Sequence, residues 1–171
     1  MDIHGPNSGA ETATRFLART LAELGEKIVV AAQIIGAEET IDGVEYWDLG
    51  PDFDTQGALA RMSERGSYYL ISAGRAQPLL ESRRDSHCLS RILISHDRSG
   101  NDIGIKPQVL CRVLDYVVCV SDAQREVFLK AGAGGIPAKV VTLFNGVSLN
   151  LFSGTPGAAE LSEACFRGSA C

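Results

Sequence analysis

With 171 residues, of which 45% are hydrophobic and 22% charged, the chain is long enough for one domain with a sizeable core, but not for two full nucleotide-binding domains. Its formal net charge of −5 argues against a nucleic-acid surface, which needs clustered Lys and Arg. The five cysteines lack C-x-x-C spacing, and no apolar run is long enough to span a bilayer. These features predict a cytoplasmic protein, soluble or peripheral at the membrane, with free thiols, no bound metal and no transmembrane segment.

The first half of the chain alternates between helical and strand patterns. Residues 10–24 carry apolar side chains at helical spacing. Ser8 and Glu11 have the form of a capping box at the start of this helix, and Gly25 can end it. Residues 28–32 form a continuous apolar run, which suits a strand buried on both faces of a parallel sheet. Further strands are expected at 44–49 and 68–71, and helices at 55–65 and 76–86.

The second half continues the alternation. A strand at 92–94 ends at Ser95-His96-Asp97, and a polar loop at 98–104 leads to a short helix at 107–114. The last expected elements are a strand at 117–121, a helix at 122–132 and a strand from 139 that runs to Asn145-Gly146.

This order of elements predicts the fold class. Alternating strands and helices are typical of a doubly wound, mainly parallel, Rossmann-like α/β sheet. Ligands of such sheets bind beyond the carboxyl ends of the strands. The residues found there are Arg75, His96, Asp97, Ser121 and Asn145.

Two segments resemble a known family. The strand, helix and strand over 117–147 resemble the end of the N-terminal domain of GT-B glycosyltransferases of the family 4 type, in which a strand ends in Ser and the next ends in Asn-Gly-Val-Asp. Ser148 stands at the position of that Asp. Ser8-Gly9-Ala10-Glu11 resembles the family's Gly-Gly-Ala-Glu loop. The resemblance implies a GT-B N-terminal, acceptor-side domain over residues 1–152, followed by an irregular tail over 153–171.

The resemblance also implies a chemistry. The family transfers a sugar, with retention, from a nucleotide-sugar donor to a hydroxyl of a glycan or lipid-linked acceptor. It uses no resident cofactor, because the nucleotide sugar is a co-substrate. The donor binds mostly to a second domain, whose signature of two Glu separated by seven residues is not found in this chain. A separate donor domain is therefore an expected partner, and the chain alone is expected to be inactive.

The candidate catalytic residues are His96 and Asp97. The resemblance puts a His near the reacting sugar, where it can orient an acceptor hydroxyl or stabilise charge. The alternative is a polar strand end that caps the next segment. Ser8 and Gly9 are the candidates for contact with the donor diphosphate, because a helix N-terminus favours negative charge. Their alternative role is plain helix capping.

Four more residues are candidates for substrate binding. Arg75 and Arg98 follow strands and can bind an anionic acceptor group, although solvated surface arginine is the alternative. Ser121 and Asn145 end strands, and Asn145 with Gly146 also fits a tight turn.

The first strand of the sheet is expected to be truncated. The family has a hydrophobic strand ahead of the first helix, central in the sheet. Here residues 1–5 provide only a stub of it. Residues 28–32 and 68–71 are expected to flank its place, with edges that lack ladder partners. We therefore expect a chain of marginal stability, prone to aggregation, whose true start lies upstream.

Two other functions remain open. The chain can be a non-catalytic truncated product or a domain that docks to a partner. It can also belong to another GT-B-like enzyme, such as a sugar-nucleotide epimerase. An epimerase needs carboxylates that converge in the cleft. Asp97 is the one placed there, since Asp122 is expected to cap its helix.

Overall fold

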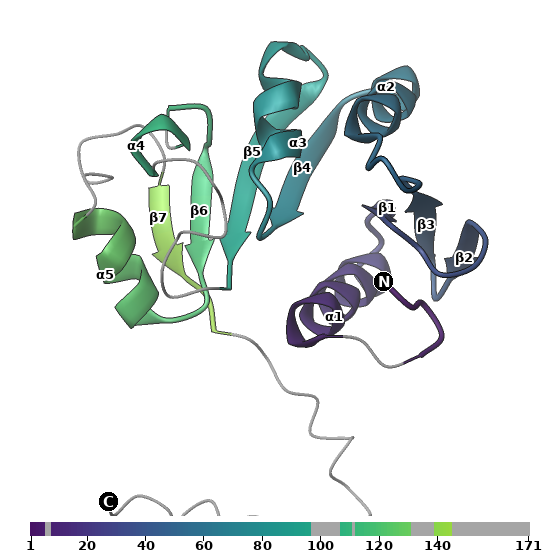
Figure 1. Cartoon of the computed structure of the whole chain (residues 1–171), viewed down its shortest axis with the longest axis horizontal. Coiled ribbons are helices and arrows are strands. Elements are labelled where there is room, and N and C mark those ends of the chain that lie inside the picture. The colour runs from purple at the N-terminus through teal and green to yellow at the C-terminus, as the bar shows by residue number, and fades with distance from the viewer. Residues whose placement is uncertain (6–7, 97–106, 111, 131–138, 145–171) are drawn as a thin grey trace, which may run out of the picture.

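The computed structural model describes residues 1–5, 8–96, 107–110, 112–130 and 139–144 (Figure 1). Its elements follow the predicted alternation of strands and helices. In chain order they are α1 (Gly9–Glu23), β1 (Ile28–Ala32), β2 (Glu39–Ile41), β3 (Val44–Asp48), α2 (Thr55–Arg65), β4 (Tyr68–Ala73), α3 (Gln77–Glu81), the 3-10 helix η1 (Ser82–Arg84), β5 (Cys88–Ser95), α4 (Pro107–Leu110), β6 (Tyr116–Cys119), α5 (Asp122–Lys130) and β7 (Lys139–Thr142).

Strand β2 is an element that the sequence patterns missed. It pairs antiparallel with β3, and the turn between them is Asp42-Gly43, both with positive φ, 51° and 79°. An Asp-Gly pair between two short strands is a strong hairpin signal, because both residues tolerate this backbone region. The hairpin was overlooked because Glu39–Ile41 is too short and too polar to show a strand pattern.

The described strands form two sheets. A three-stranded sheet has the order β1-β3-β2, with β1 and β3 parallel. A four-stranded sheet has the order β4-β5-β6-β7 and is parallel throughout. The α/β class and a parallel sheet flanked by helices are therefore confirmed, and this sheet is compatible with the predicted Rossmann-like fold. None of the helices in the described ranges is long and apolar enough to cross a membrane.

Helices cover one face of the four-stranded sheet. Leu79 of α3, Leu110 of α4 and Phe128 of α5 pack with Leu93 and Val117 of the central strands in one buried cluster. The opposite face carries a row of apolar side chains that remain partly exposed. Its most exposed members are Tyr69, Ile71, Tyr116 and Val141. Helices α3, α4 and α5 thus lie on one face of this sheet, and the doubly wound arrangement stays a prediction.

Helix α1 covers the three-stranded sheet. Its buried Ala18 packs against Val30 of β1 and Val44 and Tyr46 of β3. Ile3, almost fully buried, completes this smaller core from the segment before the helix. The apolar side chains whose spacing predicted α1 therefore face a sheet, as those of amphipathic helices do.

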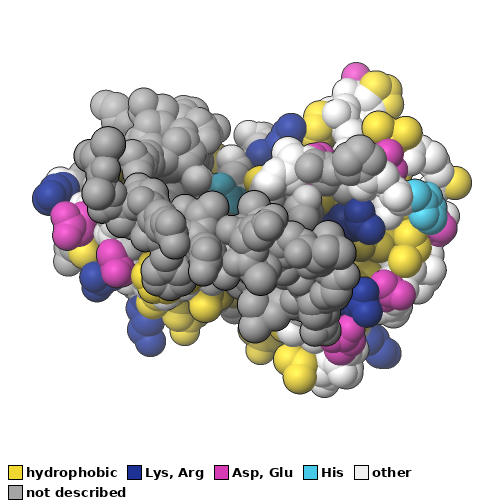
Figure 2. Space-filling model, turned by 90° about the horizontal axis from the view of Figure 1, so that it is seen from below, with side chains coloured by type: hydrophobic (Ala, Val, Ile, Leu, Met, Phe, Trp, Pro, Cys, Tyr) yellow, Lys and Arg dark blue, Asp and Glu magenta, His cyan; other side chains and the backbone are white. Residues whose placement is uncertain are grey.

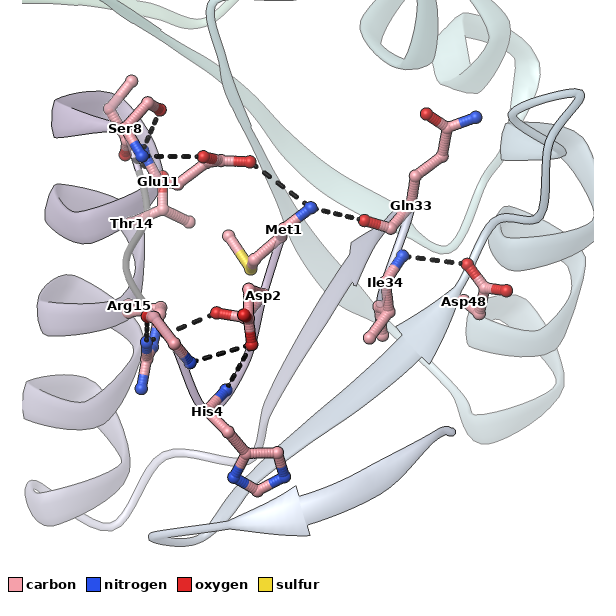
Figure 3. A network of polar contacts seen from close by, with 12 residues as sticks. Met1, Asp2, His4, Ser8, Glu11, Thr14, Arg15, Gln33, Ile34 and Asp48 are labelled. Atoms are coloured by element: carbon pink, nitrogen blue, oxygen red, sulfur yellow. Dashed lines mark hydrogen bonds and ion pairs between the residues drawn. The ribbon is translucent and has the colours of Figure 1, made fainter. Parts of the chain in front are cut away.

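Both strands expected to flank the truncated first strand are edge strands. Strand β1 ends one sheet and β4 ends the other. The carbonyl oxygen of Ala32 points toward β3, where it accepts a hydrogen bond from Leu49 N. The next groups along the chain, Gln33 O and Ile35 N, instead form hydrogen bonds with Met1 (Figure 3). Successive peptide groups of an extended strand point to opposite edges, so Met1 lies on the β1 edge that faces away from β3. A short parallel stub, bridged at Asp2 and Ile35, therefore begins where β1 ends.

Helix α2 joins the two sheets. On one side, the guanidinium groups of Arg61 and Arg65 stack on the Trp47 ring of β3, at 3.9 and 4.7 Å from its centroid. On the other side, the Ser63 hydroxyl donates to Asp85 Oδ2, at 2.5 Å, in the turn before β5. The helix has no fully buried residue of its own, so these polar and cation–π contacts hold it in place.

Asp85 is the centre of this connection. Its carboxylate accepts from the hydroxyls of Ser63 and Tyr68 and from the backbone N–H of His87. Burial alone would raise the pKa of the Asp85 carboxyl, but these hydrogen bonds outweigh burial and lower the pKa to about 2. Burial and the same contact hold the pKa of the Tyr68 phenol well above its ordinary value, so Tyr68 stays a donor.

We predict that Asp85→Asn destabilises the chain by about 1–3 kcal/mol, because an amide cannot accept all three hydrogen bonds and leaves donors unpaired. Urea unfolding measures this difference, with Asp52→Asn, an exposed carboxylate, as the matched control. The folded-state pKa of Asp85 is depressed, so its contribution is complete above the ordinary value of 3.8 and is lost as pH falls toward 2. The stability gap between the wild type and Asp85→Asn should shrink over that interval. A gap that is constant with pH would contradict this assignment.

We also predict that Ile71→Lys lowers aggregation with little change in melting temperature. Ile71 is 40% exposed on the open face of the four-stranded sheet, and a charge there discourages association of apolar sheet surfaces. Light scattering and thermal melts measure the two effects. Leu93→Lys, on the covered face, is the control and should unfold the chain. If Ile71→Lys unfolds it equally, the face is covered in solution.

Candidate functional site

The carboxyl ends of β4, β5 and β6 meet on one side of the molecule. Ala73 pairs with Ile94, and Ser95 pairs with Cys119, so His96 follows β5 between the ends of its two neighbours. This is the lower side in Figure 1, where α1 also begins. The space-filling view of that side shows acidic, basic and apolar side chains interspersed over its described part (Figure 2). Candidate ligand-binding groups from several elements thus share one surface.

His96 is half-buried at this end of the sheet. Burial lowers the pKa of its imidazole below the ordinary 6.5, because the charged form loses solvation. The ring is therefore neutral at pH 7, and one of its nitrogens is an acceptor. Among the residues that the structure describes, none hydrogen-bonds the imidazole. A neutral, partly exposed imidazole can accept a proton from a hydroxyl group that binds beside it.

A buried amide fixes the strand ends next to His96. The Gln124 side chain donates to Ser95 Oγ at 2.8 Å and accepts from Val120 N at 3.0 Å. Gln124 and Ser95 are each only 2% exposed. This link between β5 and β6 sets the position of the residue that follows Ser95. The strand and helix patterns do not single out Gln124, although Ser121-x-x-Gln124 has the spacing of a capping box, which is a signal for it.

Ser121 and Asp122 begin α5. Ser121 Oγ accepts from Gln124 N at 3.3 Å, which is the contact of a helix cap. Asp122 Oδ1 accepts from the hydroxyl of Thr142 at 2.7 Å and ties the helix to the end of β7. Both side chains therefore have structural roles. A substrate contact from Ser121 stays a prediction.

Arg75 follows β4, and Gly74 before it has a φ of 75° that turns the chain. The guanidinium lies over the Phe53 ring at 3.9 Å from its centroid. The backbone is fixed by Ser72 Oγ, which donates to Arg75 O at 2.5 Å. Stacking uses the face of the guanidinium and leaves its N–H edge available, so the exposed Arg75 is positioned for an anion.

The N-terminus of α1 has the predicted capping box. Ser8 N donates to Glu11 Oε2 at 2.9 Å, and Glu11 N donates to Ser8 Oγ at 3.4 Å. The Met1 amino group lies 3.3 Å from Glu11 Oε1 and donates to Gln33 O (Figure 3). The Ser8 hydrogen bonds hold the pKa of Glu11 below its ordinary value. The capping role of Ser8 is thus confirmed, whereas its contact with a diphosphate is still a prediction.

Gly9 is exposed at the same helix start, and a Cβ built on it would meet no atom within 4 Å. The backbone here is open to a ligand. The other predicted site residues, Asp97, Arg98 and Asn145, lie outside the described residues. Within the described ranges, no group of three or more His, Cys, Asp or Glu could hold a metal ion.

Comparisons with protein-family models, with curated proteins and with solved structures find no match to this chain. Support for a function therefore comes from the geometry of the strand ends and from the segments that resemble the glycosyltransferase family.

We predict that the imidazole of His96 titrates below 6.5, the ordinary value. NMR detection of the histidine ring protons over pH 4–8 measures this pKa, and His96→Gln assigns the resonance by removing it. A Gln124→Met variant is the companion test, because loss of the amide link should change the His96 chemical shift. Titration of His96 at or above 6.5 would show that the ring is solvated, and the argument for a neutral base would fail.

Proposed function

We propose that the chain is the N-terminal, acceptor-side domain of a retaining GT-B glycosyltransferase of the family 4 type. It acts with a donor-binding domain to transfer a sugar from a nucleotide sugar to an acceptor hydroxyl. The observation that carries the proposal is the position of the half-buried His96 at the carboxyl end of β5, between Arg75 and the start of α5. Ligands of parallel α/β sheets bind at that end.

His96 orients the acceptor in this proposal. A neutral imidazole nitrogen accepts a hydrogen bond from the acceptor hydroxyl and places its oxygen toward the anomeric carbon of the donor sugar. Burial supports this role, because a protonated ring could not accept that bond. Gln124 supports it indirectly, since its two hydrogen bonds hold β5 and β6 in fixed register below the ring.

Two further groups bind the negatively charged parts of the donor and the acceptor in this proposal. The helix N-terminus at Gly9 contributes unpaired backbone N–H groups and a positive dipole end, which favour the donor diphosphate. The negative charge of Glu11 would oppose a phosphate, but its oxygens are held by Ser8 N and lie near the Met1 amino group. Arg75, stacked on Phe53, would bind an anionic group of the acceptor.

A second candidate is a non-catalytic docking domain, favoured by the open edges of β1 and β4 and the exposed apolar face of the four-stranded sheet. The epimerase alternative has less support. Asp97, the carboxylate expected in the cleft, lies outside the described residues, and Asp122 bonds to Thr142.

A complementation experiment tests the proposal. The chain is purified alone and together with a separately expressed family 4 donor domain, and each sample is supplied with UDP-sugars and GDP-sugars and a panel of hydroxyl acceptors. We expect no transfer by the chain alone, because contacts to the leaving diphosphate supply much of the catalysis. We expect transfer in the complemented sample, lowered about 10²–10⁴-fold by His96→Gln. Mass spectrometry of the acceptor and release of nucleoside diphosphate measure it.

His87→Gln is the matched control, since His87 lies before β5 at the opposite end of the strand, and it should leave transfer unchanged. Transfer by the chain alone would contradict the need for a donor domain. A complemented sample with full activity in His96→Gln would remove His96 from the site. A stable complex that transfers no sugar would favour the docking function.

A further inference from the structure

A groove of about 560 Å³ lies at the amino-terminal edge of the four-stranded sheet, between η1, the start of β5 and the turn after α4. Four arginines and one carboxylate, that of Asp115, are among the residues that line it. Arg91 precedes His96 by five residues on β5, so the groove is about 16 Å along the strand from the candidate site. It is therefore separate from the surface assigned to sugar transfer. The arginines are Arg83, Arg84, Arg91 and Arg112.

Three of these guanidinium groups have no side-chain partner among the described residues. Arg83, Arg84 and Arg112 are exposed, and no described carboxylate lies within 4.0 Å of them. The other described arginines all have partners. Arg19, Arg61 and Arg65 pair with carboxylates; Arg15, Arg91 and Arg125 donate to oxygens of the chain; and Arg75 stacks on Phe53. The unpaired arginines are thus gathered in one groove of an acidic protein.

The guanidinium group of Arg91 is held in place in the groove by hydrogen bonds to the chain. It donates to Ser82 O at 2.6 Å and to Ser82 Oγ at 3.2 Å, and makes a longer contact to Asp85 O. The nearby carboxylates are already engaged. Asp115 accepts from Arg91 N at 2.8 Å, and Asp85 accepts from Ser63, Tyr68 and His87. The lining of the groove therefore contains four guanidinium groups and one carboxylate, and this excess of positive charge favours a bound anion.

We propose that this groove binds a small soluble molecule that carries two or more phosphate groups. The planar guanidinium group bonds phosphate oxygens in pairs, and several such groups around a concave surface suit a compact polyanion. A concave site favours a soluble ligand over a membrane surface, which needs a projecting face. The ligand stabilises the fold when it binds, because it neutralises charges that otherwise repel.

Binding of inorganic pyrophosphate tests the proposal. Isothermal titration calorimetry is performed at neutral pH and 100 mM salt on the full chain and on the triple variant Arg83→Gln, Arg84→Gln, Arg112→Gln. We expect saturable binding by the wild type and a Kd at least tenfold higher in the variant. The control variant Arg19→Gln, Lys27→Gln, Lys130→Gln removes the same charge from exposed positions elsewhere and should stay within twofold of the wild type.

Three outcomes would overturn the proposal. They are absence of saturable binding by the wild type, equal loss of binding in both variants, and binding to vesicles without competition by pyrophosphate. Where circular dichroism shows that the triple variant does not fold, the single variants Arg84→Gln and Arg112→Gln take its place, and a Kd unchanged in both overturns the proposal. The vesicle arm uses phosphatidylcholine with and without phosphatidylserine, so it separates a lipid headgroup from a free phosphate. Equal loss in both variants would mean that net charge attracts the anion, whereas selective loss in the groove variant supports a built site.

Discussion

The hydrogen bonds to Asp85 hold the two parts of the fold together. One carboxylate accepts from Ser63 of α2, from Tyr68 at the start of β4 and from the backbone at His87 before β5. Helix α2 is fixed on its other side by stacking of its arginines on Trp47 of β3. The described strands form two sheets with no ladder between them. Helix α2 and its polar contacts therefore connect the two sheets, whereas in an undivided sheet continuous backbone pairing makes this connection.

The division of the sheet has consequences for stability. Among the described residues, the β1 and β4 edges carry backbone groups without strand partners, apart from the short stub at Met1 and Asp2 that begins where β1 ends. An open edge beside an apolar sheet face is a site for association with another chain. Because of this open edge and this apolar face, a docking function is the alternative to sugar transfer for this protein.

The two ends of the four-stranded sheet differ in their electrostatics. At the carboxyl ends, burial keeps His96 neutral, and Gln124 fixes the adjacent strand ends with neutral hydrogen bonds. At the amino ends, Arg91 is held by carbonyl groups, while its arginine neighbours form no ion pair with the described residues. A neutral base suits an uncharged hydroxyl, whereas unpaired guanidinium groups suit phosphate. One sheet thus presents two chemically distinct surfaces about a strand length apart.

The sequence by itself determined the local features of this protein. Apolar periodicity located α1, β1, β4, β5 and β6, the spacing of Ser8 and Glu11 defined the capping box, and the strand ends placed Arg75, His96 and Ser121 at one edge. The three-dimensional arrangement set the remaining features, because sheet pairing, burial and contacts between charged groups depend on residues far apart in the chain. It divided the strands into two sheets, buried Gln124 against Ser95, and brought Arg83, Arg84 and Arg112 together around Arg91. Periodicity reports which face of an element is apolar, but it does not report what that face meets.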